Sequence, residues 1–191
     1  MTKTRDSSAP ASGRERILDA AAARFSRQSY DQTGLREIAA DAGVDVAYVH
    51  RCFGSKEQLF HEALKCAVQM EKIFDAVGAD PARILAAHLL EEDEPDAKVR
   101  PMDILIRSLT SPKAAAVLRT AVMEDFVTPL GAHLDEDATQ RAALAAALLM
   151  GIGILRDVLE LPALSEGPGG ALERSVAETL AVVLGQANPK I

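Results

Sequence analysis

A chain of 191 residues, nearly half of them hydrophobic, can bury a substantial core, which argues against a disordered protein. The apolar residues are mostly Ala, Leu, Ile and Val, Trp is absent, and no strand-like alternation persists, so we predict an all-α protein. The net charge of −7 is unevenly placed: residues 1–60 carry 9 Lys and Arg against 8 Asp and Glu, and the remainder carries 12 against 20. The acidic body disfavours nonspecific DNA binding, while the N-terminal part can still meet phosphates.

Targeting and membrane features are weak in this sequence. The two cysteines, Cys52 and Cys66, have hydrophobic neighbours in helical patterns, which predicts reduced, buried thiols. The N-terminus lacks the apolar segment of a signal peptide, so we expect residues 1–12 to form a disordered arm. The longest apolar run, Ala142–Leu155, falls short of the roughly 18 residues that span a bilayer. We therefore expect a cytoplasmic protein with no membrane partner.

Capping residues mark two short helices at the start of the chain. Ser12 followed by Glu15 is a capping box, and it predicts a first helix from about residue 14 to residue 28. Thr33 is expected to cap a second helix, because hydroxyl side chains accept hydrogen bonds from the first free amides. Gly43 is expected to end this helix, since glycine tolerates the left-handed conformation that closes helices.

The next two helices follow without a break. Asp45 predicts the N-cap of a third short helix, and Gly54 predicts its end. Ser55 with Gln58 forms another capping pattern and opens a long fourth helix, Lys56–Val77. A helix of that length suits a connector between two domains.

The rest of the chain is expected to hold five more helices, which makes about nine in all. Their predicted ranges begin at Asp80-Pro81, at Pro101, at Ser111-Pro112, at Asp137 with Gln140 as a capping box, and at Leu172. The fourth of these runs to about Leu159, and Gly185 closes the last.

Three short helices with a Gly-Val turn between the second and third have the anatomy of a helix-turn-helix. The segment Thr33–Phe60, TGLREIAADAGVDVAYVHRCFGSKEQLF, resembles the DNA-binding motif of the TetR family. The matching positions are Ile38, Ala39, Ala42, Gly43, Val44, Phe53, Gly54, Ser55, Lys56, Glu57 and Leu59. Tyr48, His50 and Cys52 depart from the commonest residues, which bears on the operator sequence. The resemblance implies a DNA-binding domain at residues 13–60, joined by the long helix to an effector-binding and dimerisation domain at residues 61–191.

The resemblance and the side-chain chemistry together nominate a set of DNA-binding residues. Thr33 lies at a helix N-terminus suited to phosphate, Arg36 can fork onto a guanine, and Lys56 is expected on a phosphate. Arg36 also fits a plain solvated helix charge. The recognition helix supplies the others, namely Asp45, Val46, Ala47, Tyr48 and His50. The first four start the helix, Val46 and Ala47 fit a thymine methyl group, and Tyr48 and His50 are expected near the DNA backbone. Val46 also fits a plain core residue.

In the C-terminal domain the resemblance implies a ligand pocket and a homodimer built from the last two helices of each subunit. The expected pocket residues, each of which also fits an ordinary core position, are His88, Met102, Ile106, Leu109, Leu118, Met123 and Phe126. Their apolar character predicts an unidentified small hydrophobic effector. The expected dimer residues are Ala143, Leu144, Ala147, Leu148, Gly151, Ile152 and Leu155, with Val176, Leu180 and Val183 on the last helix.

We therefore interpret the chain as a repressor that binds a pseudo-palindromic double-stranded DNA operator as a dimer and is released by a small hydrophobic molecule. No Ser/His/Asp order, phosphate loop, metal spacing or paired-carboxylate site stands out, so we expect no catalytic residue, cofactor or metal. An enzyme with an accidental helix-turn-helix pattern is the rival class. A regulator that works without an effector, or under the control of a partner, is the other alternative.

Overall fold

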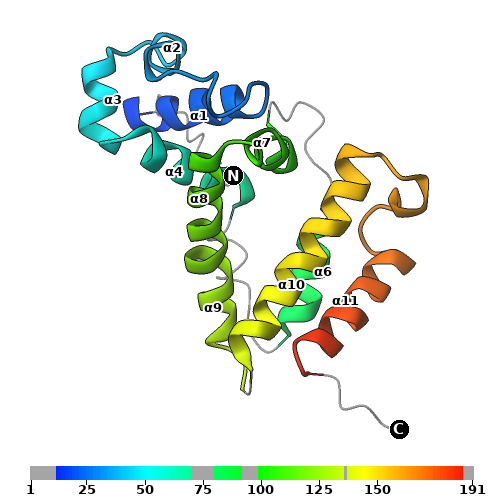
Figure 1. Cartoon of the computed structure of the whole chain (residues 1–191). Coiled ribbons are helices and arrows are strands. Elements are labelled where there is room, and N and C mark those ends of the chain that lie inside the picture. Colours follow the sequence, from blue (N-terminus) through cyan, green and yellow to red (C-terminus); the bar gives the residue numbers. More distant parts are fainter. Residues whose placement is uncertain (1–11, 70–79, 92–98, 136, 187–191) are drawn as a thin grey trace, which may run out of the picture.

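The computed structural model describes residues 12–69, 80–91, 99–135 and 137–186, and the regular structure within these ranges is entirely helical (Figure 1). This confirms the predicted all-α class. The elements are α1 (Gly13–Phe25), α2 (Leu35–Asp41), α3 (Val46–Phe53), α4 (Lys56–Val68), α6 (Pro81–Leu90), α7 (Pro101–Ser108), α8 (Pro112–Ala121), η1 (Val122–Val127), α9 (Thr128–Gly131), α10 (Ala138–Gly153), η2 (Ile154–Val158), η3 (Pro162–Leu164) and α11 (Ala171–Val183). The π-helical elements η1 and η2 continue α8 and α10, and η3 is a 3-10 turn.

The first helix begins as its capping box predicts. The Ser12 hydroxyl oxygen accepts a hydrogen bond from the Glu15 amide at 3.2 Å, and the Glu15 carboxylate accepts one from the Ser12 amide at 2.6 Å. The predicted N-terminal arm lies outside the described residues, except for Ser12 itself. The N-cap predicted for α2 is wrong by one residue: Gly34 is the cap, and the Glu37 carboxylate accepts its amide at 3.0 Å.

Two glycines close the short helices in the left-handed region, as predicted. Gly43, after α2, has φ +64°, and Gly54, after α3, has φ +73°. No atom lies within 4 Å of where a Cβ would stand at either residue, so backbone conformation rather than space calls for glycine. The turn at Gly43 joins α2 to α3, and the turn at Gly54 joins α3 to α4.

Three aromatic side chains form the centre of the N-terminal half. The ring centroids of Phe25 and Phe60 are 4.8 Å apart, those of Tyr30 and Phe60 are 5.2 Å apart, and both pairs are edge-to-face. All three side chains are at most 1% exposed, and this burial raises the pKa of Tyr30. The cluster fixes α1, the loop after it and α4 against one another.

The connecting helix is shorter than predicted. α4 ends at Val68, where Gln69 adopts the left-handed conformation with φ 55° and ψ 39°, whereas the sequence predicted a helix through residue 77. The rest of that predicted range, residues 70–77, lies outside the described residues. The expectation of two buried thiols is also wrong, because Cys66 on α4 is exposed and Cys52 on α3 is half-buried.

The N-terminal core continues beyond residue 60, the domain boundary that the sequence suggested. α7 and α8 pack on α1 and α4 through the buried side chains Ile104, Leu105, Ala114, Leu118 and Ala121. Two hydrogen bonds reinforce this packing, from Arg107 Nε to the Ser26 carbonyl at 2.8 Å and from Ser111 Oγ to Asp31 Oδ1 at 3.0 Å. The first four helices therefore rest on part of the C-terminal body.

A second core lies between α6, α10, α11 and the segment from η1 to α9. Leu130, Ala142 and Ala145 are fully buried in it. Val176 and Leu180 of α11 are buried in the same core, at 4% and 0% exposure, so their predicted place on a dimer interface is wrong. The sequence stripe on α11 faces α6 of its own chain because α11 packs there.

The most apolar helix is also the longest. α10 and η2 run without a break over Ala138–Val158, 21 residues that are long and apolar enough, by length and composition alone, to cross a membrane. The uninterrupted apolar run of the sequence, Ala142–Leu155, is shorter than this helical segment. The capping box predicted at Asp137 and Gln140 does not form, since Asp137 is left-handed and makes no side-chain cap. Only 22% of the most apolar window is buried within the chain, so much of this helix lies exposed.

Candidate functional site

The outer face of α3 is the first candidate site, at the end of the molecule shown at the upper left of Figure 1. Val49 and Phe53 are buried, at 1% and 6% exposure, and they fasten the helix to the core. Ala47, His50 and Arg51 are exposed on the opposite side. A short helix held from behind, with small and cationic residues in front, has the form that enters a major groove.

The start of α3 is capped by the residue that the sequence predicted. Asp45 Oδ1 accepts hydrogen bonds from the amides of Ala47 at 2.6 Å and Tyr48 at 3.2 Å. The Asp45 carboxylate therefore acts as the N-cap of α3. Val46 is half-buried and packs against the first core, which leaves Ala47 as the outward residue of the first turn.

Tyr48 lies against the first helix. A Cβ atom at Gly13 would be 2.9 Å from Cε1 of Tyr48, so the ring occupies space that the glycine leaves open. The guanidinium of Arg51 lies over this ring, 5.4 Å from its centroid, and Tyr48 is hydrogen-bonded to Cys52, which raises the pKa of the phenol. The Tyr48 ring therefore packs between α3 and the start of α1, and the Arg51 guanidinium lies on it.

His50 is exposed with one ring nitrogen in use. Its Nδ1 is 3.1 Å from the carbonyl oxygen of Gly54. A carbonyl can only accept, so Nδ1 carries a proton and donates it here. In this tautomer the other ring nitrogen, Nε2, is an acceptor, and the exposed side chain leaves it available to a donor on a base edge.

Lys56 is placed differently from the sequence prediction. Its ammonium nitrogen donates to the carbonyl oxygen of Tyr30 at 2.5 Å and lies 4.1 Å from the centroid of the Tyr30 ring. Partial burial lowers the pKa of Lys56. These contacts place Lys56 at the joint between α4 and the loop after α1, and the hydrogen bond uses one of the three N–H donors of its ammonium group.

Thr33 and Arg36, both predicted to contact DNA, differ in their exposure to solvent. Thr33 is 1% exposed, and its hydroxyl donates to the Ser29 carbonyl at 3.1 Å, so the hydroxyl predicted to meet phosphate is already used inside the fold. Arg36 stands exposed on α2 and forms no ion pair with another described residue. Arg36 therefore keeps the position that the sequence predicted for groove contact.

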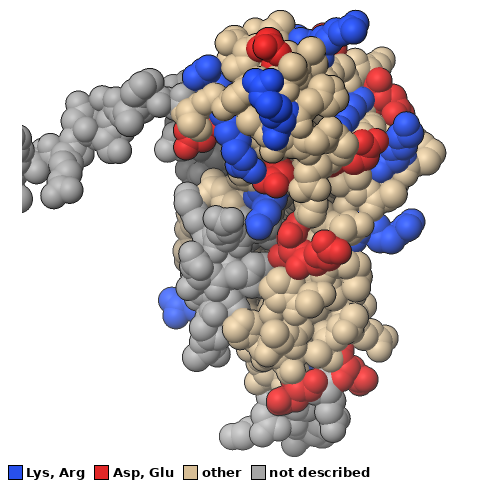
Figure 2. Space-filling view, turned by 90° about the vertical axis from the view of Figure 1, so that its left-hand side faces the viewer, with Lys and Arg blue, Asp and Glu red and all other residues tan. Residues whose placement is uncertain are grey.

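The structure adds Arg51, which the sequence reading missed. It follows Ala47 by one helical turn and so lies on the same face, a spacing that would have found it once the inward positions were known. Figure 2 shows basic side chains over the upper part of this side of the molecule, with acidic ones among them, while the lower part is uncharged over its centre and carries acidic side chains above and below.

A cavity of about 610 Å³ in the body is the second candidate site. It lies between α4, α6, α7, η1 and α10. Of the predicted lining residues, His88, Met102, Leu118 and Phe126 line it, and Ile106, Leu109 and Met123 do not. Leu109 and Met123 are 51% and 40% exposed, and Ile106 packs against the first core, because α7 and η1 turn other faces inward.

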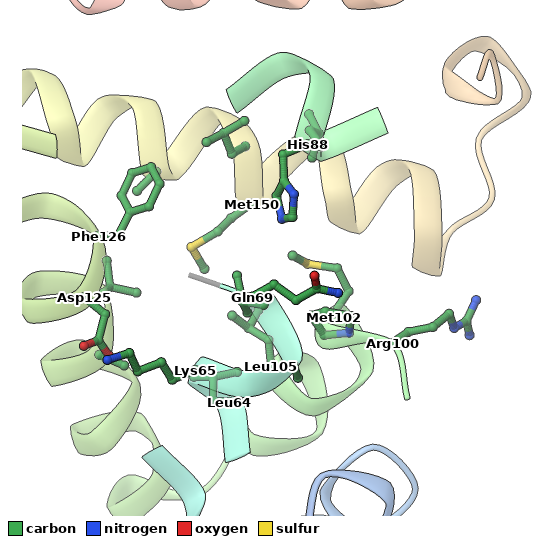
Figure 3. Close-up of a pocket in the computed structure, with 18 of the residues that line it drawn as sticks. Leu64, Lys65, Gln69, His88, Arg100, Met102, Leu105, Asp125, Phe126 and Met150 are labelled. Atoms are coloured by element: carbon green, nitrogen blue, oxygen red, sulfur yellow. The ribbon is translucent and has the colours of Figure 1, made fainter. Parts of the chain in front are cut away.

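The cavity lining is more polar than the sequence predicted. Around its apolar side chains stand polar and charged ones that sequence reading missed, among them Lys65, Gln69, Arg100 and Asp125 (Figure 3). Nothing in their sequence spacing marks them, since they come from separate elements. Among the described residues, no group of three or more His, Cys, Asp or Glu side chains could hold a metal ion.

The outer face of α10 is the third candidate site. The side of this helix that faces away from the second core carries Ala143, Leu144, Ala147, Gly151 and Leu155, all of them exposed. Leu144 is 53% exposed, and no atom lies within 4 Å of a Cβ placed on Gly151. Leu148, Ile152 and Val183, the other predicted dimer residues, are half-buried against the second core.

Two residues with small hydroxyl side chains, Ser175 and Thr179, lie exposed on α11. The Ser175 and Thr179 hydroxyls donate to the carbonyls four residues earlier, at 3.0 and 2.8 Å, so neither needs water or a partner to satisfy it. Val182, further along the helix, is 66% exposed. Ser175, Thr179 and Val182 are exposed together with Ala171, Arg174 and Glu178, whereas Val176 and Leu180 face inward.

Comparisons with known proteins match both the N-terminal and the C-terminal part of the chain. A model described as bacterial regulatory proteins, tetR family, matches residues 17–63, and one described as tetracyclin repressor-like, C-terminal domain, matches residues 80–184. A TetR-family regulator from Streptomyces coelicolor A3 is 26% identical, with 91% of this chain and 94% of that chain covered and a TM-score of 0.60. A transcriptional regulator from Rhodococcus sp. Rha1 is 27% identical, with 93% and 98% covered and a TM-score of 0.61. Salmonella enterica GusR, at 17% identity, 95% and 100% coverage and a TM-score of 0.67, is alike in fold. No curated protein matches significantly.

Proposed function

Because this chain belongs to the TetR family of bacterial transcriptional regulators, we propose that it is a cytoplasmic repressor that binds a pseudo-palindromic operator as a homodimer. Family membership makes it a DNA-binding regulator rather than an enzyme. The observation that carries the proposal is the outer face of α3, which has Ala47, His50 and Arg51 outward and is fixed from behind by buried side chains.

The proposed DNA contacts follow from what each side chain still has available. Arg51 and Arg36 have guanidinium groups on the outer side of α3 and α2, and either can fork onto a guanine. Ala47 fits the methyl group of a thymine, and His50 Nε2, the acceptor of the neutral ring, fits an amino group on a base edge. Thr33 and Lys56 support this face from inside the fold.

The proposed dimer covers the outer face of α10. The small residues Ala143, Ala147 and Gly151 recur every four positions, which lets a second helix approach closely. An apolar helix with so little of its surface buried in its own chain is stabilised by a partner surface. A two-fold dimer would place two copies of α3 at successive major grooves, roughly 34 to 36 Å apart.

The proposed release by a small molecule depends on α4, which touches both the DNA-binding half and the cavity. His61 on α4 donates from Nε2 to Asp125 Oδ2 at 2.5 Å, and Asp125 on η1 lines the cavity. A ligand that shifts η1 would thereby shift α4. The cavity volume lies within the usual range for small-molecule sites, which supports an effector over the effector-independent alternative.

Selection of binding sites from random DNA tests this function. The full chain should enrich an inverted repeat, and sedimentation of the complex should show an even number of chains per site. Enrichment of a single half-site with one chain bound would contradict the dimer. Absence of any enriched sequence would contradict sequence-specific regulation.

A further inference from the structure

Two polar side chains from different elements point into the cavity. Gln69 caps the C-terminus of α4 in the left-handed region, a conformation that costs a non-glycine residue free energy, and its amide extends into the cavity (Figure 3). His88 on α6 reaches the same space, with its Nδ1 3.3 Å from Glu91 Oε2. A ligand in the cavity therefore meets an amide and an imidazole.

The charged groups of the lining already have partners. The described lining residues with charge are three basic and three acidic side chains, namely Lys65, Arg100, Arg156, Glu91, Asp125 and Asp157. Asp125 accepts from His61, Glu91 faces His88, and Arg156 donates to the Leu89 carbonyl at 2.7 Å. The Arg100 guanidinium donates to Asp103 and to the carbonyl of Asp157. Lys65 and Asp157 also make contacts within the chain, and Arg156 Nε lies 3.9 Å from Asp157 Oδ1.

This pairing selects against a charged ligand. A carboxylate group would enter the cavity without a counter-charge of its own, or would have to break an existing pair, and an ammonium group would have to displace His61 from Asp125 or His88 from Glu91. Either course costs free energy, because an unpaired charge loses its hydration there. The lining as a whole is balanced in charge, so no long-range attraction compensates for this cost.

The remaining walls are apolar and adaptable. Leu64, Leu105 and Phe126 form part of them, and Met102 and Met150 extend their thioethers into the space (Figure 3). Methionine side chains conform to flat surfaces, and their sulfur atoms make favourable contacts with aromatic rings. These walls suit the body of an aromatic molecule.

Resting on the effector role proposed above, we propose that the cavity takes an uncharged aromatic molecule that carries one hydroxyl group. Nδ1 of His88 lies 3.3 Å from the Glu91 carboxylate, which favours the neutral tautomer with its proton on Nδ1 and leaves Nε2 as an acceptor for the ligand hydroxyl. The Gln69 amide nitrogen then donates to the hydroxyl oxygen. One hydroxyl thus satisfies both side chains, and the ring packs between Met102 and Met150.

Equilibrium dialysis of the full chain against three naphthalene compounds tests this ligand class. 2-Naphthol should bind, and 2-methylnaphthalene, which lacks the hydroxyl, should bind about fivefold to tenfold more weakly. Naphthalene-2-carboxylate should bind more weakly than either. Carboxylate binding equal to or tighter than naphthol binding would overturn the proposal, as would a lack of naphthol binding.

A variant localises the hydrogen bond. Gln69→Gly removes the amide and suits the left-handed backbone, so the chain should fold and lose about fivefold in affinity for 2-naphthol, with no loss for 2-methylnaphthalene. Gln186→Gly, at an exposed residue beyond α11, is the matched control and should change neither affinity. Equal losses for both compounds in Gln69→Gly would overturn the assignment of the hydroxyl.

The effector role fails in a different way. If 2-naphthol binds as expected but operator affinity stays constant at saturation, the ligand class stands and the release mechanism is wrong. If naphthalene-2-carboxylate releases DNA and 2-naphthol does not, the release mechanism stands and the ligand class is wrong.

Discussion

The N-terminal half and the body of this protein are stabilised by different means. In the N-terminal half, a fully buried aromatic cluster and several ion pairs, such as Arg24 with Asp41 at 2.6 Å, hold short helices in one arrangement. The body has alanine-rich helices, two π-helical segments, a cavity and an exposed apolar face on α10. The difference indicates that one half keeps a fixed shape for DNA, while the other can accept a ligand and a partner.

The π-helical segments sharpen this difference. η1 contributes Asp125 and Phe126 to the cavity, and η2 contributes Arg156 and Asp157. A wider turn inside an α-helix changes the direction of the side chains that follow it, and such turns are common at functional sites. Both long helices of the body therefore change their winding where they border the cavity.

The largest expected effect comes from truncating the aromatic cluster. Phe60→Ala should lower the free energy of unfolding by about 3 to 5 kcal/mol, because the side chain is fully buried between two other rings. Phe126→Ala should cost less, about 2 kcal/mol, because this buried ring already borders the cavity on one side. Urea unfolding measures both, and equal losses would contradict the contrast between a rigid half and an adaptable body.

The next effect concerns the outer face of α10. Gly151→Leu has room in the single chain but should separate the two subunits, raising the dimer dissociation constant at least about 100-fold, or roughly 2.7 kcal/mol. Gly153→Ala is the control. Its Cβ would lie 3.2 Å from Met102, on the inner side of α10 beside the cavity, and not on the outer face. Dimerisation should therefore persist in this variant. Sedimentation equilibrium decides between them, and an intact dimer in Gly151→Leu would place the interface elsewhere.

A smaller effect separates the two cations first nominated for DNA. Lys56→Met should lower the free energy of unfolding by about 1 kcal/mol, since it removes the bond to the Tyr30 carbonyl, and should leave DNA affinity and its salt dependence unchanged. Arg36→Ala should leave the free energy of unfolding nearly unchanged and should weaken operator binding by about 1 to 3 kcal/mol. A reduced salt slope in Lys56→Met would restore Lys56 as a phosphate contact.

The smallest effect is the response of the N-terminal half to acid. Ion pairs with arginines lower the pKa of Asp41, beside Arg24, and of Glu62, beside Arg14. A carboxyl group with a lowered folded pKa stabilises the fold above its unfolded pKa and loses that contribution as the pH falls through the folded value. Stability should therefore decline below about pH 5, and the double variant Asp41→Asn, Glu62→Gln should show a flatter decline. Urea midpoints at several pH values measure the difference, and parallel curves would contradict it.

Local rules predicted much of the fold. The caps at Ser12, Asp45 and Asp80 and the glycine stop at Gly43 form as expected, because each depends on a few neighbouring residues. The failures depend on packing. α4 ends early at Gln69, for which no local pattern gave a stop signal.

The candidate sites show the same limit. Sequence spacing gave the outward face of α10 and most of that of α3, since helical periodicity alone defines a face. It could not decide that Val176 faces α6, or that the Lys56 ammonium folds back onto Tyr30, because those contacts join distant segments. The polar groups of the cavity, such as Gln69 and Asp125, escaped for the same reason.

The role of α3 can be tested with one substitution on its outer face. Ala47→Glu places a carboxylate at an exposed position of this helix without touching the core, and Ala116→Glu does the same on α8 as a control. Fluorescence anisotropy with the selected operator should show at least about a 100-fold loss of affinity for Ala47→Glu, because the new charge meets phosphates and base edges. Ala116→Glu should bind like the unaltered chain. Operator affinity unchanged in Ala47→Glu would show that α3 does not enter the groove.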